Sequence, residues 1–124
     1  MTTASDARTS ATRYRPWVAV AFVLMVMHNV DEAFIHPEPG GKISVVGDTI
    51  LGIVLVYFYP RLGRRWRIAV TAILGTVGTL QALGGHVVHV VQGNAVPLDY
   101  SGFLFLAGGL VLIAVAVAEF RRGR

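Results

Sequence analysis

Apolar residues run in four long stretches that are separated by short polar or proline-containing connections. The stretches cover about residues 17–36, 43–59, 68–91 and 98–120. Their lengths are close to the roughly 20 residues that an α-helix needs to cross the hydrocarbon layer of a bilayer. Consecutive helices joined by short connections pack as antiparallel neighbours. The pattern therefore predicts an all-α integral membrane protein that folds as a four-helix, up-and-down antiparallel bundle.

Prolines mark several ends of these stretches. Pro16 suits the first turn of the first helix, Pro37 ends that helix, and Pro60 closes the second one. Residues 1–13 are rich in Ser, Thr and Ala and have no apolar periodicity, so we expect a disordered cytoplasmic tail there. The single four-span transmembrane domain is predicted over residues 14–124.

Basic residues gather on one side of the predicted spans. They precede the first stretch, lie between the second and third, and follow the fourth, whereas Lys42 is alone on the other side. The positive-inside rule then predicts a multi-pass protein of the cell membrane with both termini in the cytoplasm. The residues on the cytoplasmic side are Arg8, Arg13, Arg15, Arg61, Arg64, Arg65, Arg67, Arg121, Arg122 and Arg124.

Composition agrees with the membrane interpretation and excludes some chemistry. The 124 residues are 54% hydrophobic and 15% charged, which differs from an ordinary soluble domain. The absence of cysteine excludes disulfides, thiolate metal ligands and cysteine-based catalysis. The net charge of +4 does not predict a nucleic-acid partner, because the arginines flank apolar stretches. The lipid bilayer is the expected partner, and a homo-oligomer is left open.

The first stretch carries ionisable residues in its second half. In a helix, His28, Glu32 and His36 fall at i, i+4 and i+8 on one stripe, with Asp31 beside them. An ionisable group at membrane depth costs a few kcal/mol and is usually retained because a partner, a water-filled cavity or a function holds it. One face of this helix is therefore expected to line a polar region.

Depth below the outer loops can be estimated at about 1.5 Å per residue. Glu32, Asp48 and His86 then lie level with one another, roughly 6 to 8 Å below the helix ends, and His28 lies on the order of 12 Å down. We therefore expect a polar cavity that opens to the extracytoplasmic side. Other polar residues are expected nearer its rim: His36, His89, Asp99 and Tyr100.

The cytoplasmic half is expected to be plain apolar helix with a fringe of arginines. Glu119 is predicted to reach the interface or to pair with Arg122. Asp48 and Asp99 have a simpler alternative role, as first-turn acids that the helix dipole favours. Five aromatic residues are predicted to be interface anchors: Trp17, Trp66, Tyr57, Tyr59 and Tyr100.

A metal site is one functional hypothesis. His28 with Glu32, and His86 with His89, are spaced at i, i+4 and i, i+3, so each pair faces one way and could ligate one ion from facing helices. Imidazole and carboxylate ligands suit a divalent zinc, iron or copper ion rather than calcium.

Metal-free acid/base catalysis is a second hypothesis. Buried carboxyl groups and histidines can supply an acid and a base near neutral pH. Glu32 or Asp31 would act with His28 or His86, and Tyr100 would donate a hydrogen bond. The enzyme would be an isomerase, cyclase or hydrolase acting on a lipid-like or small apolar substrate.

Other functions stay open at this stage. Intramembrane acid and histidine chains also serve as proton relays, which would make the protein a small proton-linked transporter or sensor. A haem held by two histidines is a minor alternative. The same polar residues could also form a buried network with only a structural role.

The run His28-Asn29-Val30-Asp31-Glu32 resembles the bacterial membrane-protein family named for its His-x-x-Glu-Glu motif. Members are small multi-span proteins of unknown function that also carry another histidine and a Tyr-x-Pro-Gly motif. Here an aspartate replaces the first glutamate, and Pro37-Glu38-Pro39-Gly40 matches only the Pro-Gly end of the second motif. Either His86 or His89 would be the additional histidine. The resemblance implies that His28, Asp31 and Glu32 act together.

Overall fold

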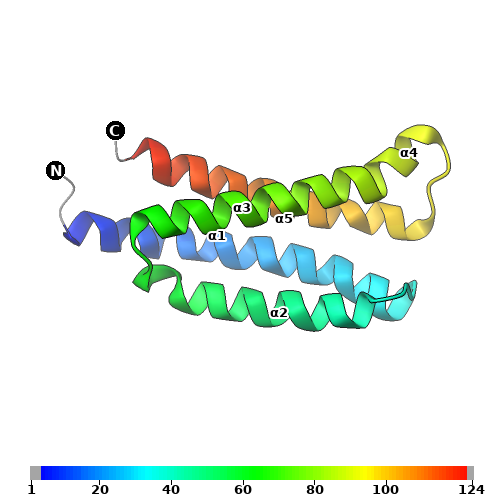
Figure 1. Ribbon diagram of the computed structural model, residues 1–124, viewed down its shortest axis with the longest axis horizontal. Helices are drawn as coiled ribbons and strands as arrows, with labels where there is room; N and C mark the ends of the chain where they lie inside the picture. Colours follow the sequence, from blue (N-terminus) through cyan, green and yellow to red (C-terminus); the bar gives the residue numbers. More distant parts are fainter. Residues whose placement is uncertain (1–3, 123–124) are drawn as a thin grey trace.

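The computed structural model describes residues 4–122, and within that range every regular element is helical (Figure 1). The all-α prediction is therefore confirmed. Two π-helical turns, η1 and η3, extend α1 and α3, and a 3₁₀ turn, η2, follows α2. The elements are α1 (Ala4–Val30), η1 (Asp31–Ile35), α2 (Gly41–Phe58), η2 (Tyr59–Arg61), α3 (Arg64–Ala82), η3 (Leu83–Val87), α4 (Val88–Gln92) and α5 (Pro97–Arg121).

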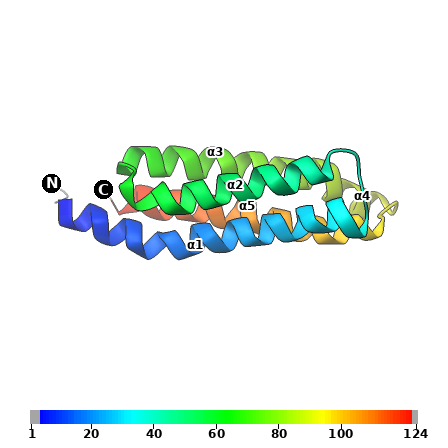
Figure 2. The same cartoon turned by 90° about the horizontal axis from the view of Figure 1, so that it is seen from below.

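Four long helical segments lie side by side and reverse direction at each connection (Figures 1 and 2). Both termini lie at one end, called here the proximal end, and the 36–40 and 93–96 connections lie at the distal end. Each segment is long and apolar enough to cross a membrane and overlaps one predicted stretch. They are Ala11–Ile35, Gly41–Arg61, Arg64–Gln92 and Pro97–Arg121.

The first helix begins earlier than the sequence pattern predicts. Residues from Ala4 onward are helical, so the disordered tail predicted over 1–13 is wrong from that point, and residues 1–3 lie outside the described range. Adding residues to an existing helix costs far less than starting one, which allows a polar segment to continue α1. Ala11 is fully buried, so this part of the helix is also packed.

Close helix packing centres on α5. It packs against both α1 and α3, whereas α2 packs mainly against α1. Glycines permit the α3–α5 approach, because a Cβ atom on Gly75 would lie 2.8 Å from the Gly109 carbonyl oxygen. Small residues allow membrane helices to approach in this way.

A buried ion pair near the proximal end overturns three predictions. Arg67 on α3 and Glu119 on α5 are almost fully buried, with Nε–Oε1 and Nη2–Oε2 distances of 2.9 and 3.1 Å. The Tyr59 hydroxyl donates to Glu119 Oε1 at 3.4 Å and is itself buried, so it is not an interface anchor. Arg122 lies over the Tyr14 ring instead of pairing with Glu119. The proximal half is therefore not plain apolar helix.

The reason for these corrections is geometric. Contacts within one helix can be read from residue spacing, but Arg67 and Glu119 meet across two helices that are far apart in the chain. The remaining predicted anchors, including Trp17, Trp66, Tyr57 and Tyr100, are more than half exposed, as residues at a membrane interface would be.

Candidate functional site

A mostly polar cavity of about 250 Å³ lies between the helices toward the distal end. All four long segments contribute to its lining. Four residues expected to converge from their depth, His28, Glu32, Asp48 and His86, are among the lining residues. The complete lining is His28, Asn29, Glu32, Ser44, Asp48, Gln81, Ala82, His86 and Phe105.

One histidine of the cavity is oriented by a buried carboxylate. His86, in the π-helical turn η3, has Nδ1 3.1 Å from Oδ1 of Asp99, whose side chain is 3% exposed. The second oxygen, Oδ2, accepts the Val96 backbone N–H at 2.8 Å and so caps the start of α5. An ionised carboxylate only accepts hydrogen bonds, so Nδ1 of His86 must donate. In the neutral ring, Nε2 is then the nitrogen that can accept a proton.

A serine orients the second histidine of the cavity. The Ser101 hydroxyl donates to the Leu98 carbonyl at 3.0 Å, and His28 Nδ1 lies 2.9 Å from the same hydroxyl oxygen. Because a hydroxyl has a single proton, the serine accepts from His28. The neutral His28 ring therefore also has a proton on Nδ1 and an accepting Nε2.

The two histidine rings touch each other. Their centroids are 4.6 Å apart at an angle of 78°, and Phe105 packs edge-on against His28 at 5.6 Å. His28 is 3% exposed. A glycine makes room for this arrangement, since a Cβ atom on Gly102 would overlap the His86 ring. The two rings are therefore positioned both by hydrogen bonds and by packing against neighbouring rings.

Two carboxyl groups line the same cavity, and within the described residues one has a hydrogen-bond partner and the other has none. Asp48 Oδ2 accepts a hydrogen bond from Asn29 Nδ2 at 2.7 Å, which ties α2 to α1. Among residues 4–122, the Glu32 side chain forms no hydrogen bond or ion pair with another residue, although it lines the cavity. Glu32 is therefore the carboxylate available to a bound molecule.

Several predicted site residues lie beside the cavity without lining it. Asp31 is hydrogen-bonded to His36, with 2.7 Å between Oδ1 and Nδ1. Tyr100 is 62% exposed and is not among the lining residues. The helical stripe predicted for His36 fails because the π-helical turn η1 ends at Ile35, and the backbone at His36 is no longer helical. His36 and Tyr100 are therefore not lining residues, and their expected place at the rim of the cavity stays a prediction.

The predicted metal ligands are not gathered into one chelating set. No group of three or more His, Asp or Glu side chains in the described part of the chain is arranged to hold a metal ion. His28, Glu32 and His86 share the cavity, but His89 binds Asp99 through Nδ1 at 3.2 Å from outside it, with a half-exposed side chain.

Sequence reasoning missed the groups that orient the histidines. Asp99 was expected near the rim, but not as the shared partner of His86 and His89. One available signal was its place three residues after Val96 at the start of a helix, where an acid caps the backbone. Ser101 had no comparable signal, because serine is common in membrane helices. The other lining residues missed are Asn29, Ser44, Gln81 and Phe105.

Comparisons of the chain with protein-family models, with curated proteins and with solved structures found no match. The resemblance to the His-x-x-Glu-Glu family therefore stays a prediction from the sequence. In the structure His28 and Glu32 line the cavity, whereas Asp31 binds His36 and also interacts with Ser101, the partner of His28.

Proposed function

We propose that the protein is an integral protein of the cell membrane with both termini in the cytoplasm. Four helices of sufficient length and apolar character support the membrane location. The arginine bias toward the proximal end supports the orientation, since Lys42 alone provides a basic Lys or Arg side chain at the distal end. The polar cavity then lies in the extracytoplasmic half of the membrane.

Within that cavity we propose acid/base catalysis on a lipid-phase substrate. The observation that carries the proposal is the His86–Asp99 pair beside Glu32, because it combines an oriented base with an unpaired carboxyl group. His86 Nε2 would accept a proton from the substrate, and Glu32 in its protonated form would deliver one. A proton moved from one substrate atom to another gives an isomerisation or a cyclisation.

The size of the cavity bears on the substrate. Its volume of about 250 Å³ is below the roughly 300 to 1,000 Å³ of pockets that enclose a drug-sized ligand. The cavity is therefore suited to the reactive end of a long apolar molecule, while the rest of that molecule stays among the lipid chains. His28 and Phe105 would pack against the reactive end.

Deuterium incorporation tests this function even though the substrate is unidentified. Purified protein in nanodiscs is incubated with a total membrane lipid extract in D₂O, and the lipids are analysed by mass spectrometry. Wild-type protein is expected to introduce solvent deuterium into one lipid class. His86→Gln and Glu32→Gln are each expected to slow this incorporation by at least about 100-fold, which is the usual minimum for a general acid or base.

His89→Gln is the matched control, because His89 binds the same aspartate but does not line the cavity. It should retain most of the incorporation. The proposal is wrong if wild-type protein incorporates no deuterium, or if His86→Gln is as active as His89→Gln.

A structural role is the second candidate, and one observation favours it. His28, Asp48 and His86 each already have a side-chain partner, as expected of a network that fixes helix register. Under this alternative, His86→Gln and Asp48→Asn lower the midpoint of thermal unfolding but change no chemistry. Combined thermal and deuterium measurements on the same variants separate the two candidates.

A further inference from the structure

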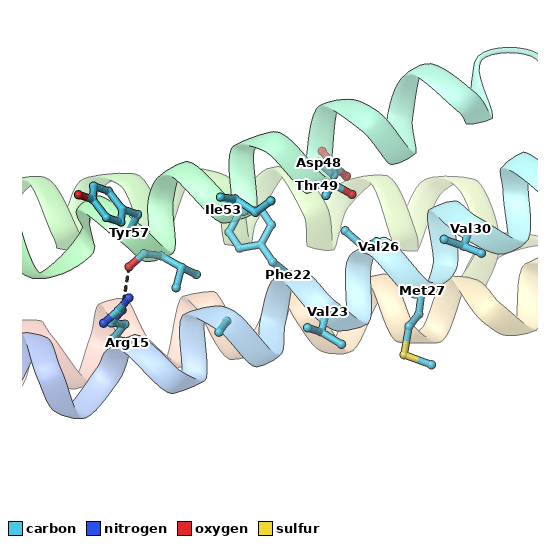
Figure 3. Close-up of a pocket in the computed structure, with 13 residues that line it drawn as sticks. Arg15, Phe22, Val23, Val26, Met27, Val30, Asp48, Thr49, Ile53 and Tyr57 are labelled. Carbon is cyan, nitrogen blue, oxygen red and sulfur yellow. Dashed lines mark hydrogen bonds between the residues drawn. The ribbon is translucent and has the colours of Figure 1, made fainter.

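A second cavity lies between α1 and α2 and differs from the first in its lining (Figure 3). It is a groove of about 550 Å³ whose middle is entirely apolar. Phe22 points from α1 toward α2, where a Cβ atom on Gly52 would lie 2.9 Å from its ring. Glycine thus lets the ring pack closely against α2. Apolar side chains along the groove include Ala19, Val23, Val26, Ile53 and Val56.

The proximal end of the groove is basic. Arg15 donates from Nε to the Val56 carbonyl at 2.9 Å, a bond drawn in Figure 3, which holds its guanidinium at the groove. Arg61 places its guanidinium carbon 4.3 Å above the Tyr57 ring and donates to the Tyr57 carbonyl at 2.8 Å. Tyr57 also lines the groove. Arg15 therefore lines the groove itself, and Arg61 lies next to it on the ring of Tyr57.

The two ends of the groove have different chemistry. On α2 the lining runs from Tyr57 to Thr49 and Asp48, and on α1 it runs from Arg15 to Val30, which lies beyond Asp48 in Figure 3. At about 1.5 Å per residue, the wall from Arg15 to Val30 is about 22 Å long. The hydrocarbon part of one leaflet is about 15 Å thick, half of the bilayer core. The groove is therefore long enough for an acyl chain that runs from the proximal surface to the middle of the membrane.

We propose that this groove binds one acyl chain of an anionic phospholipid from the leaflet on the side of the termini, with the lipid phosphate between Arg15 and Arg61. Guanidinium groups bind phosphate oxygens through paired, charge-assisted hydrogen bonds. The apolar walls match the chain, and the basic end matches the headgroup. The groove adjoins the acid/base cavity at Asp48, which lines both, but the lipid proposal does not depend on the proposed reaction.

Native mass spectrometry of delipidated protein tests the site. Phosphatidylglycerol and phosphatidylcholine with identical acyl chains are titrated separately. We expect tighter binding of phosphatidylglycerol, and an affinity at least about tenfold lower in the double variant Arg15→Gln/Arg61→Gln. Arg65→Gln/Arg121→Gln is the matched control, because it removes the same charge from two exposed arginines at the same end.

The acyl part of the site needs its own variant. Val26→Trp fills the groove and should weaken binding of both lipids, whereas Val77→Trp adds the same bulk to an exposed position on α3 and should not. Inorganic phosphate at the lipid concentration should not displace the lipid, because it lacks the acyl chain.

Three results would overturn the proposal. The first is an equal loss of affinity in the two arginine double variants, which indicates nonspecific charge attraction. The second is displacement of the lipid by inorganic phosphate, which indicates a phosphate site alone. The third is a protein dimer that Val26→Trp dissociates, which indicates that a second copy of the chain occupies the groove.

Discussion

The Asp99 carboxylate accepts three hydrogen bonds. It receives Nδ1 of His86 and His89 on one oxygen and the Val96 backbone N–H on the other. A buried carboxylate with these partners fixes the ring orientation of His86 and the start of α5 together. Second partners of this kind determine which ring nitrogen of a histidine faces a reacting group.

The orientation of the His86 ring can be tested by adding a single methyl group at Gly102. Gly102→Ala puts a Cβ atom into the His86 ring, so the ring must leave Asp99. We expect deuterium incorporation to fall by at least about 100-fold while the chain stays folded. Gly47→Ala is the control, since a Cβ atom there meets nothing within 4 Å. Equal activity of the two variants would show that the position of His86 is unimportant.

Glu119 is expected to matter for stability rather than for chemistry. Glu119→Gln leaves the buried Arg67 guanidinium without its counter-charge, a change that typically costs about 3 kcal/mol or more. The free energy of unfolding in mixed detergent should fall by that amount. Glu38→Gln, in an exposed loop, should change it by less than about 0.5 kcal/mol. A small effect at Glu119 would mean that the ion pair contributes little.

At the scale of single residues, the sequence predicted the depth of the cavity residues but not their hydrogen-bond partners. Glu32, Asp48 and His86 could be placed at one level, with His28 deeper, by counting residues from the loops, and all four line one cavity. The partners of Glu119 and of the histidines depend on how helices rotate about their axes. Residue counting does not determine that rotation.

Two π-helical turns lie at the level of the cavity, one in each of the segments that carry its histidines. In η1 and η3 the backbone bonds from i to i+5, and such turns occur frequently at functional sites. Glu32 lies in η1 and His86 lies in η3. The wider turn shifts the side chains from the positions that a continuous α-helix would give.

Deletion of Gly84 tests the role of η3. The deletion is expected to convert the π-helical turn to α-helix, because removing one residue from a turn bonded from i to i+5 leaves i to i+4 bonding. Thermal stability should be unchanged or higher, but His86 should lose its contact with Asp99 and deuterium incorporation should fall. If the deletion variant keeps full incorporation, the π-helical turn does not position the catalytic base.

The sequence predicted the long elements but not these turns. Apolar runs and prolines located all four long segments to within several residues, because hydrophobic length and proline act locally. A π-helical turn has no comparable local signal. Gly84 and Gly85 precede His86, but glycines are frequent in membrane helices and do not by themselves predict such a turn.

Orientation is a property of the whole molecule, and the cysteine-free chain makes it easy to measure. Glu38→Cys and Asn94→Cys place single thiols in the two distal loops, and Arg65→Cys places one at the proximal end. In intact cells, a membrane-impermeant maleimide should label the first two, but Arg65→Cys only after permeabilisation. The reverse pattern would place the polar cavity on the cytoplasmic side.

The central claim is that His28 and His86 meet in one cavity with Nδ1 protonated and Nε2 available in both neutral rings. Solid-state NMR of ¹⁵N,¹³C-histidine-labelled protein in lipid bilayers measures this directly, with His28→Gln and His86→Gln used for assignment. The account predicts Nδ1–H signals for both rings and a through-space correlation between them, since their centroids are 4.6 Å apart. Protonation at Nε2 in either neutral ring, or the absence of a correlation between the rings, would contradict it.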